Sequence, residues 1–512
     1  MYMNRPRHFF LLITLLGALN TLGASTYYVD ATEGDDQHCG THAEKAWQTL
    51  EKLNSVTFTP GDKILFKAGE IWVGSFTPKG SGKAGAPIIV DRYGEGNRPI
   101  LDGKGQVDHV IRLENIDHWE LYNLEITNNS QIEGDRIGVF IVADSGVRRH
   151  FRLRNLFIHH IMGRYTFDMV GKNTGGIGII GKNDTRFDDI LIEHCVIGDL
   201  VRVGIFTNGN EGVPGDRPIT NLIVRNNTIY RCAGDGAIIR FADKPLIERN
   251  EAYENHNGPQ DLVIHGVALW CRSTDGAIFQ FNHVHHTVGD KDGQAFDADL
   301  EARDTIVQYN YSHDNAGGFM LVYGSSRDAI VRYNISYNDG YQGKHIFDFP
   351  IWTEPRGSGI FHNNIIYLPK GNPAVIADEA LETARFYNNI FYHGGKGTLL
   401  TLDKTNRPYF SNNCYYGYSS EDTDLDANAI IAHPQFVGSD EAMREEMHPE
   451  LFKLNDESLC IGLGTAHFSS DKYPTLPSEL KDFFNNPLST FPIDVGAHAY
   501  TAEKNRAISS EK

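Results

Sequence analysis

Several kinds of residue pattern are scarce in this sequence of 512 residues, and each scarcity excludes a class of protein. The six cysteines are too widely spaced for a zinc-binding pattern or a dense disulfide framework. After residue 24, no run approaches about 18 consecutive apolar residues, so no membrane span is predicted. Basic side chains number 47 against 66 acidic ones, and the formal net charge of −19 argues against nucleic acid and against an anionic membrane as partners.

The first 24 residues have the composition of an export signal. Two arginines precede the apolar run at residues 9–19, and small residues follow near Ala24. This order of charged, apolar and small residues predicts a secretory signal peptide over residues 1–24. We therefore expect a secreted or periplasmic protein.

Short apolar runs that carry an asparagine recur along most of the chain, for example "VRNNTIY", "VQYNYSH", "VRYNISY" and "FYNNIFY". From residue 227 onward the matching asparagines are 23 to 32 residues apart. The aligned positions are Asn123, Asn155, Asn227, Asn250, Asn282, Asn310, Asn334, Asn364, Asn389 and Asn413, and His194 stands at this position in a further copy. The period predicts a solenoid with loops of variable length between its coils.

Each repeat holds two or three short alternating apolar runs and no helical pattern of sufficient length. Repeats made only of strands bury their apolar side by stacking, so the sequence predicts an all-β, single-stranded parallel β-helix over residues 106–420. We expect the asparagines to adopt the left-handed backbone of a bend and to hydrogen-bond to one another from coil to coil.

Both ends of a solenoid need a cover. Residues 25–105 contain the predicted N-terminal cap and first coils, where apolar residues in "AEKAWQTLEKLN" follow the spacing of an amphipathic capping helix. Within residues 421–500, the runs "ESLCIGLG" and "FPIDVGAHAY" predict strands that close the other end. Residues 501–512 are polar and predict a flexible tail.

The chain resembles the secreted right-handed parallel β-helix proteins of the pectate-lyase-like superfamily. The resemblance lies in "YYVDATEGDD", "PGDKILFKAG", the asparagine repeats and the closing "FKLNDESLCIGLG". It implies the fold and a carbohydrate-active protein, but this fold hosts lyases, hydrolases, epimerases and binding proteins. The pectin-lyase "WiDH", polygalacturonase "GHG" and epimerase "DPHD" segments are absent, so the catalytic residues of those families cannot be transferred.

Two aspartates stand out in the segment "FDADLEARDTIVQYN", which aligns with "FMLVYGSSRDAIVRYN" in the next coil. Strand alternation places Phe296, Ala298 and Leu300 toward the core, and Asp297 and Asp299 outward on the exposed flank. Aspartate is disfavoured inside strands, which favours a functional role. Neighbouring carboxylates raise one pKa, so that one carboxyl group can donate a proton while the other is ionised, as glycoside hydrolysis requires.

Neighbouring segments supply further candidates. The additional candidates for proton transfer are His286, Lys344 and His345, and those for substrate binding are Trp270, Arg272, Tyr323, Asp348, Trp352 and Arg356. In "DKDG", Asp290 and Asp292 are either turn residues or Ca²⁺ ligands, although the other ligands of an EF-hand are missing. The histidines of "HVHHT" are structural, act in proton transfer or bind a metal.

Three functions follow from these residues. The leading hypothesis is a secreted glycoside hydrolase that acts on a polysaccharide or oligosaccharide through Asp297 and Asp299 and requires no cofactor. The Asp-rich segment is similar to that of lacto-N-biosidase-like glycosidases, which draw catalytic aspartates from one compact segment.

The first alternative is a polysaccharide lyase or epimerase in which Ca²⁺ bridges a uronate carboxylate to Asp292, Asp297 or Asp299. A residue from the set His286, Tyr323, Lys344 and His345 would then take the C5 proton. The second alternative is a glycan-binding β-helix without catalysis. We expect a monomer that neither binds nucleic acid nor spans a membrane.

Overall fold

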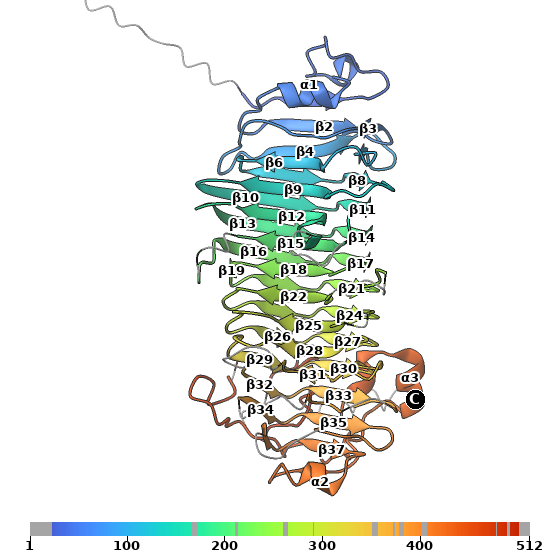
Figure 1. Ribbon diagram of the computed structural model, residues 1–512, viewed down its shortest axis with the longest axis vertical. Coiled ribbons are helices and arrows are strands. Elements are labelled where there is room, and N and C mark those ends of the chain that lie inside the picture. The colour runs from blue at the N-terminus through green and yellow to red at the C-terminus, as the bar shows by residue number, and fades with distance from the viewer. Residues whose placement is uncertain are drawn as a thin grey trace, which may run out of the picture.

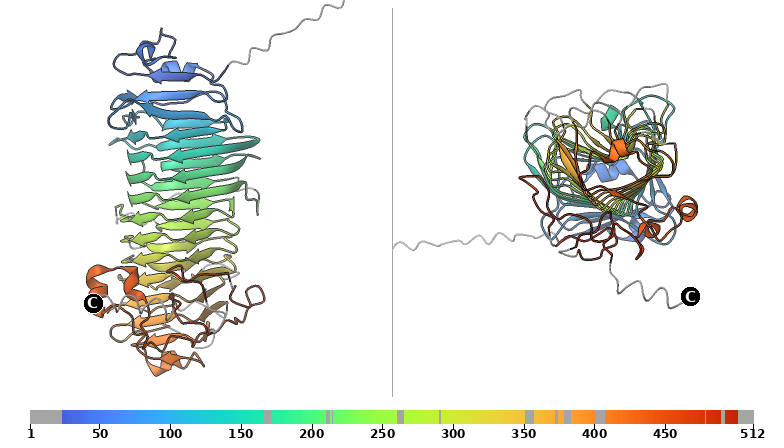
Figure 2. Two further views of the ribbon diagram at one scale, coloured as in Figure 1. Left: turned by 180° about the vertical axis from the view of Figure 1, so that it is seen from behind. Right: turned by 90° about the horizontal axis from the view of Figure 1, so that it is seen from below.

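The chain forms an elongated rod of stacked coils (Figure 1). The computed structural model describes residues 23–500, apart from 166–170, 210–212, 214, 260–264, 290, 351–356, 372–373, 378–382, 401–406, 478 and 489–491. Most of the predicted signal peptide and the whole predicted tail at 501–512 therefore lie outside the described residues. In the view along the rod, the strands of successive coils superpose (Figure 2).

The described strands form three parallel sheets, named here by their number of strands. In spatial order, the 15-stranded sheet contains β1 (Thr26–Val29), β2 (Lys63–Lys67), β4 (Ile88–Tyr93), β7 (Trp119–Tyr122), β10 (Val147–Arg154), β13 (Arg186–Glu193), β16 (Ile219–Arg225), β20 (Leu246–Glu248), β23 (Ile278–Gln280), β26 (Ile306–Gln308), β29 (Ala329–Arg332), β32 (Gly359–His362), β34 (Ala384–Tyr387) and β36 (Tyr409–Ser411), with β19 (Ala242–Asp243) beside β16.

The 14-stranded sheet contains β3 (Ile71–Val73), β5 (Ile100–Asp102), β8 (Glu125–Asn128), β11 (Phe157–Ile161), β14 (Val196–Leu200), β17 (Thr228–Cys232), β21 (Glu251–Tyr253), β24 (His283–His285), β27 (Tyr311–His313), β30 (Ile335–Tyr337), β33 (Ile365–Leu368), β35 (Ile390–His393), β37 (Cys414–Tyr416) and β38 (Ile430–Ile431). The 9-stranded sheet contains β6 (His109–Glu114), β9 (Ile137–Ala143), β12 (Gly175–Gly181), β15 (Val203–Asn208), β18 (Ala237–Arg240), β22 (Leu269–Arg272), β25 (Gln294–Ala298), β28 (Gly318–Val322) and β31 (Phe347–Asp348).

The described helices are short. They are α1 (Leu50–Ser55), α2 (Ser420–Thr423) and α3 (Asp440–Glu446), with 3₁₀ turns η1 (Ala43–Lys45), η2 (Gly171–Asn173) and η3 (Pro449–Phe452). None of the helices in the described ranges is long and apolar enough to cross a membrane.

Stacked apolar rows fill the inside of the rod. Phe296, for example, packs between Phe279 and Phe319, with ring centroids 6.2 and 5.5 Å away. Such rows arise because the inward-facing positions of each strand are apolar in successive coils. Stacking therefore buries apolar surface that a single coil would leave exposed to solvent. The predicted parallel β-helix is therefore confirmed.

An asparagine ladder runs along one corner of the coils from Asn227 to Asn413. Each side-chain oxygen accepts the backbone N–H and the amide N–H of the ladder asparagine in the preceding coil, at 2.9 to 3.1 Å. Asp426 ends the ladder by accepting both groups from Asn413. Every rung is buried, so each one satisfies polar groups that water does not reach.

Two details of the predicted ladder are wrong. The left-handed residue is the one before each rung, such as Asn226 with φ 54°, and not the rung itself. Asn123, Asn155 and His194 have positive φ and occupy that preceding position. In the coil of His194 the rung position is held by Cys195, whose N–H bonds to the Asn227 side chain at 2.9 Å.

The two ends differ in part from the prediction. Helix α1 covers the N-terminal end, but it is confined to Leu50–Ser55 and starts from a hydrogen bond between the Thr49 side chain and the Lys52 N–H. At the other end, α2 lies across the last coil (Figure 2). Residues 457–464 are mostly turns, and the chain from α3 onward lies along the flank of the lower coils, where Phe452 packs on Tyr367.

Candidate active site

An outward row of side chains crosses the 9-stranded sheet where β22, β25, β28 and β31 lie side by side. The strand register aligns Trp270 with Asp297, Asp297 with Leu321, and Leu321 with Asp348. Phe296 points into the core, so Asp297 next to it faces outward, as the alternation predicts. The outward row thus brings residues from four coils to one place.

This row contributes to a pocket of about 330 Å³ that is rich in carboxyl groups. The lining residues are Lys172, Asp235, His265, Val267, Trp270, Asp292, Asp297, Asp299, Leu300, Leu321, Tyr323, Asp348 and Pro350. The volume lies near the lower end of the range of small-molecule sites, about 300–1,000 Å³. The described pocket therefore suits a small part of a glycan.

Asp297 faces outward but is covered. Only 7% of the residue is exposed, and its Oδ1 atom has no hydrogen-bond partner among the residues that the structure describes. Burial raises the pKa of Asp297 well above its ordinary value, and the negative charges of Asp299 and Asp292 raise it further. The expectation that this carboxyl group is open to solvent is wrong, and its surroundings favour the protonated form.

Asp299 lies just beyond the strand. Because β25 ends at Ala298, the alternation stops there, and Leu300 lines the pocket instead of facing the core as predicted. The Leu300 N–H donates to Asp299 Oδ1 at 2.6 Å. Burial raises the pKa of Asp299, while this hydrogen bond and the charge of Arg272 act in the opposite direction. Asp299 is therefore the easier of the two carboxyl groups to ionise.

Asp292 is a third carboxylate of the same pocket. It has φ 58° in the turn before β25, and its Oδ2 atom lies 3.0 Å from Nδ1 of His265. From the sequence, Asp290 and Asp292 were expected to be either turn residues or calcium ligands, and Asp290 lies outside the described residues. The role of Asp292 as a calcium ligand is still a prediction, and its position in the pocket adds a possible part in substrate chemistry.

A buried ionic network forms one wall of the pocket. Asp235 Oδ1 accepts hydrogen bonds from Trp270 Nε1 at 2.8 Å and from the Val267 N–H at 3.0 Å. Its Oδ2 lies 3.7 Å from Lys172 Nζ and 3.4 Å from Arg202 Nη1. Burial acts to raise the pKa of Asp235, but Lys172, Arg202 and the hydrogen bond from Val267 together lower it. The anionic form of Asp235 is therefore favoured beside Arg202 and Lys172, while burial lowers the pKa of Lys172 itself.

Sequence reasoning did not find Lys172, Asp235 or Arg202. Lys172 comes from "GKNTGG" and Asp235 from "AGDGAII", which read as ordinary glycine-rich loop and turn segments. The ammonium group of Lys172 also lies 4.5 Å from the centre of the Trp270 ring. No local pattern joins these segments, because only the stacking of coils brings them together.

The structure brings several predicted binding residues to the pocket. Tyr323 and Asp348 line it, and burial together with Asp299 raises the pKa of Tyr323. Trp270 lines it as well, but it is only 3% exposed, so it forms a wall rather than an open stacking platform. Arg272 is not among the lining residues and acts through its charge on Asp299.

Other predicted residues lie elsewhere. His286 follows β24 in the 14-stranded sheet, where its ring contacts His285 and His313. Lys344 and His345 precede β31 and do not line the pocket. His286 therefore lies on a different sheet from the aspartates. Lys344 and His345 precede a strand of the same sheet as Asp297, and their part in proton transfer is still a prediction. The predicted residues Trp352 and Arg356 lie outside the described residues.

Comparisons with known proteins support the fold. No protein-family model matches the chain. The chain is 26% identical over 520 residues to a lacto-N-biosidase of Bifidobacterium longum subsp. longum. This match covers 81% of the chain but only 32% of that protein, so the chain spans about a third of the length of its relative.

Two solved structures are similar in shape. A GH136 lacto-N-biosidase from Eubacterium ramulus superposes with a TM-score of 0.58 at 20% identity, covering 80% of this chain and 68% of the other. A protein named XylC, in complex with xylose, superposes with a TM-score of 0.52 at 13% identity, covering 93% and 98%. The chain is a right-handed parallel β-helix of the pectate-lyase-like fold. The fold prediction is therefore confirmed for most of the chain.

Proposed function

We propose that this protein is a glycoside hydrolase that cleaves an oligosaccharide or a polysaccharide in the pocket of the 9-stranded sheet. The observation that carries the proposal is the pair Asp297 and Asp299, which line one pocket with unequal environments. Glycoside hydrolysis needs one protonated and one ionised carboxyl group on either side of the scissile bond. The relative named lacto-N-biosidase supports the same class of reaction.

In this proposal Asp297 is the acid. Burial and the neighbouring carboxylates raise the pKa of Asp297 and favour its protonated form, which donates the proton to the oxygen of the leaving sugar. Asp299 is ionised and either attacks the anomeric carbon or takes a proton from the attacking water. The hydrogen bond from the Leu300 N–H holds the Asp299 carboxylate in place.

The ionic network around Asp235 helps to position the side chains of the pocket around Asp297 and Asp299. Trp270 is fixed through its indole N–H, and the ammonium form of Lys172 places a positive charge beside the carboxyl groups of the pocket, although burial lowers the pKa of Lys172. That charge acts to lower the pKa of both Asp297 and Asp299, which limits how strongly burial raises them. We assign positioning roles to Asp235, Lys172 and Trp270, since their described contacts are with one another.

The lyase alternative receives less support. His286, Lys344 and His345 were the expected bases for the C5 proton, and none of them lines the pocket. Tyr323 does line it, but burial raises the pKa of its hydroxyl group, which disfavours the phenolate that would act as a base. The hydrolase proposal instead needs only a difference between two carboxyl groups, with the proton on Asp297, whose pKa is raised more than that of Asp299.

A glycan panel tests the proposal. We expect new reducing ends without unsaturated products, with and without a chelator. Asp297→Asn and Asp299→Asn should each lower the rate by about 10²–10⁴-fold. Asp144→Asn, an exposed aspartate on another coil, is the matched control and should keep full activity. Full activity in both pocket variants would overturn the assignment, and unsaturated products would show a lyase.

Substrates with different leaving groups separate the two roles. An aryl glycoside with an acidic phenol needs no proton, so Asp297→Asn should lose much less activity on it than on a natural glycan. Asp299→Asn should lose activity on both, because its step does not depend on the leaving group. Equal losses for the two variants on both substrates would contradict the division of roles. An Asp292→Asn variant with a larger loss would assign the acid or base role to Asp292.

We also propose that the protein is exported through residues 1–24 and acts as a monomer. The composition of that segment supports export, as does the expectation of a glycan substrate outside the cell. N-terminal sequencing of the protein recovered from culture medium or periplasm tests the cleavage near Ala24. Light scattering of the purified protein tests the monomer, which a mass near twice that of the single processed chain would contradict.

A further inference from the structure

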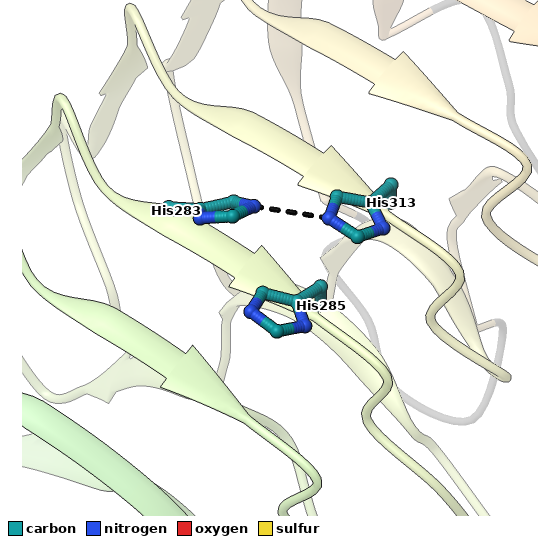
Figure 3. Close-up of side chains that lie close together, drawn as sticks. All are labelled: His283, His285 and His313. Atoms are coloured by element: carbon teal, nitrogen blue, oxygen red, sulfur yellow. Dashed lines mark hydrogen bonds between the residues drawn. The ribbon is translucent and has the colours of Figure 1, made fainter. Parts of the chain in front are cut away.

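Three histidines from two adjacent coils meet on the 14-stranded sheet, away from the acidic pocket. His283 and His285 alternate on β24 and point outward, and β27 places His313 directly opposite His285. Figure 3 shows the three rings together on the surface of the sheet. The Nε2 atoms of His283 and His313 are 3.0 Å apart, and one ring nitrogen from each of the three residues lies within 4.8 Å of the others.

A carboxylate orients the central ring. Asp314 Oδ2 lies 2.8 Å from His313 Nδ1, so the neutral ring holds its proton on Nδ1 and presents the Nε2 lone pair to His283. Metal-bound histidines commonly have such a carboxylate on the other ring nitrogen. Glu251 supplies a second carboxylate at the rim, with Oε1 3.6 Å from His285 Nε2 and 3.8 Å from His283 Nδ1.

The rings differ in their access to solvent. The side chains of His285 and His313 are 16% and 8% exposed, whereas His283 is 40% exposed. Within the described part of the chain, the buried Nε2 atom of His285 has no hydrogen-bond partner. Imidazole nitrogens are common metal ligands, so this unpaired atom is a candidate ligand.

We propose that His283, His285 and His313 form a binding site for a divalent transition metal, with Zn²⁺ as the expected ion. Imidazole suits Zn²⁺ and other first-row metals, whereas Ca²⁺ and Mg²⁺ prefer oxygen ligands. The ion links two adjacent coils and leaves a fourth position for water or Glu251. The acidic pocket lies on a different sheet, so this site is independent of the proposed hydrolysis.

The geometry needs only local change to accept the ion. A tetrahedral Zn²⁺ with Zn–N bonds of about 2.0–2.1 Å holds two nitrogens about 3.3 Å apart, close to the present 3.0 Å between His283 and His313. When the ion binds, His283 exchanges the proton on Nε2 for one on Nδ1 through solvent, so that Nε2 binds the ion and the ring is still a neutral imidazole. His285 reaches the ion by rotating its ring, because its nearest nitrogen lies within 4.8 Å of the other two ligands.

The competing explanation is a plain aromatic stack. Along the sheet, His285 continues a row of outward rings that includes Tyr253 and Tyr337, and its ring lies 5.1 Å from Tyr253 and 4.8 Å from His313. His283 is aligned in the same way with Tyr311 of the next coil. His283→Tyr and His285→Tyr therefore keep the stacked rings but remove the ligand nitrogens, which makes them matched variants for the test.

The experiment is a Zn²⁺ titration of the full chain after treatment with a chelator. We expect one tightly bound equivalent by elemental analysis after gel filtration, and a higher melting temperature with Zn²⁺ than without. His283→Tyr and His285→Tyr should lose this equivalent and the rise in melting temperature. Asp314→Asn should weaken binding about 10–100-fold, because it removes the carboxylate behind His313. His159→Gln, in a pair with His160 elsewhere on the sheet, should bind as the unchanged chain does.

Co²⁺ provides a readout on the unchanged chain. A tetrahedral complex with three imidazoles gives visible absorption, whereas hexaaqua Co²⁺ gives only a faint colour. Strong visible absorption that Zn²⁺ then displaces would support the site even if a variant fails to fold. The proposal is overturned if the unchanged chain retains no Zn²⁺ after gel filtration, or if both tyrosine variants retain the full equivalent.

Discussion

The same coils carry opposite chemistry on two of their flanks. On the 9-stranded sheet, β25 presents Asp297 to a pocket that several other carboxyl groups line. On the 14-stranded sheet, β24 and β27 present the nearly parallel rings of His285 and His313, which stack at 4.8 Å. The backbone geometry is alike on both flanks, so the difference comes only from the outward side chains.

This comparison separates residues that stabilise the folded rod from residues that destabilise it. Stacked rings in register gain contact area and aromatic interaction with each added coil. A buried carboxyl group with an unpaired oxygen, such as Asp297, costs free energy that the folded chain must offset elsewhere. Side chains with such a cost are expected where they are needed for chemistry. The acidic flank is therefore the stronger candidate for function on physical grounds.

The largest effect is expected from Asp235→Asn, which tests whether the acidic flank depends on its ionic network. The change leaves Lys172 and Arg202 buried without their counter-charge. Breaking a buried ion pair in this way costs about 3–5 kcal/mol in the free energy of unfolding. Urea denaturation at neutral pH measures this loss.

Asp188→Asn is the control for that experiment. Asp188 pairs with Arg149 on the surface, where its side chain is 31% exposed, so the loss should stay below about 1 kcal/mol. If Asp235→Asn costs no more than Asp188→Asn, the buried network does not hold the pocket together.

A smaller effect of opposite sign is expected from Asp297→Asn. The folded-state pKa of Asp297 is raised above the unfolded value, so the folded chain binds more protons in the pH window between the two. Its contribution to stability is fully present below pH of about 4 and is lost as the pH rises through the folded-state pKa. Asparagine does not ionise, so the variant should lack this loss.

Above that window the Asn variant should therefore be the more stable protein, by about 1.4 kcal/mol for each unit by which the pKa is raised. Melting temperatures of both proteins between pH 4 and pH 8 measure the difference, which should grow with pH. A difference in melting temperature that is constant with pH, or largest in acid, would show that the pKa of Asp297 is not raised in the folded chain.

The sequence predicted the repeated parts of the molecule better than the parts that depend on contacts between distant coils. The alignment of "RDTIVQYN" with "RDAIVRYN" correctly placed Asp297 outward, because both coils have the same register. The same reasoning placed Asn123 and Asn155 one position away from the true rungs, since the first coils carry Leu124 and Leu156 at that position. No sequence pattern pointed to Asp235, because its partner Lys172 is more than one coil away along the chain.

The smallest effect is expected on the aromatic flank, from His285→Tyr in the presence of a chelator. The neighbouring coils carry Tyr253 and His313 in the same row, with ring centroids 5.1 and 4.8 Å from His285. A tyrosine ring at this position continues the stack, and its hydroxyl group can reach solvent beside Glu251. Without metal, the free energy of unfolding should change by less than about 0.5 kcal/mol, as for other surface substitutions. Urea denaturation beside the unchanged chain measures it. A metal-free loss as large as that of Asp235→Asn would mean that the histidines themselves hold the coils together, and the contrast between the two flanks would then fail.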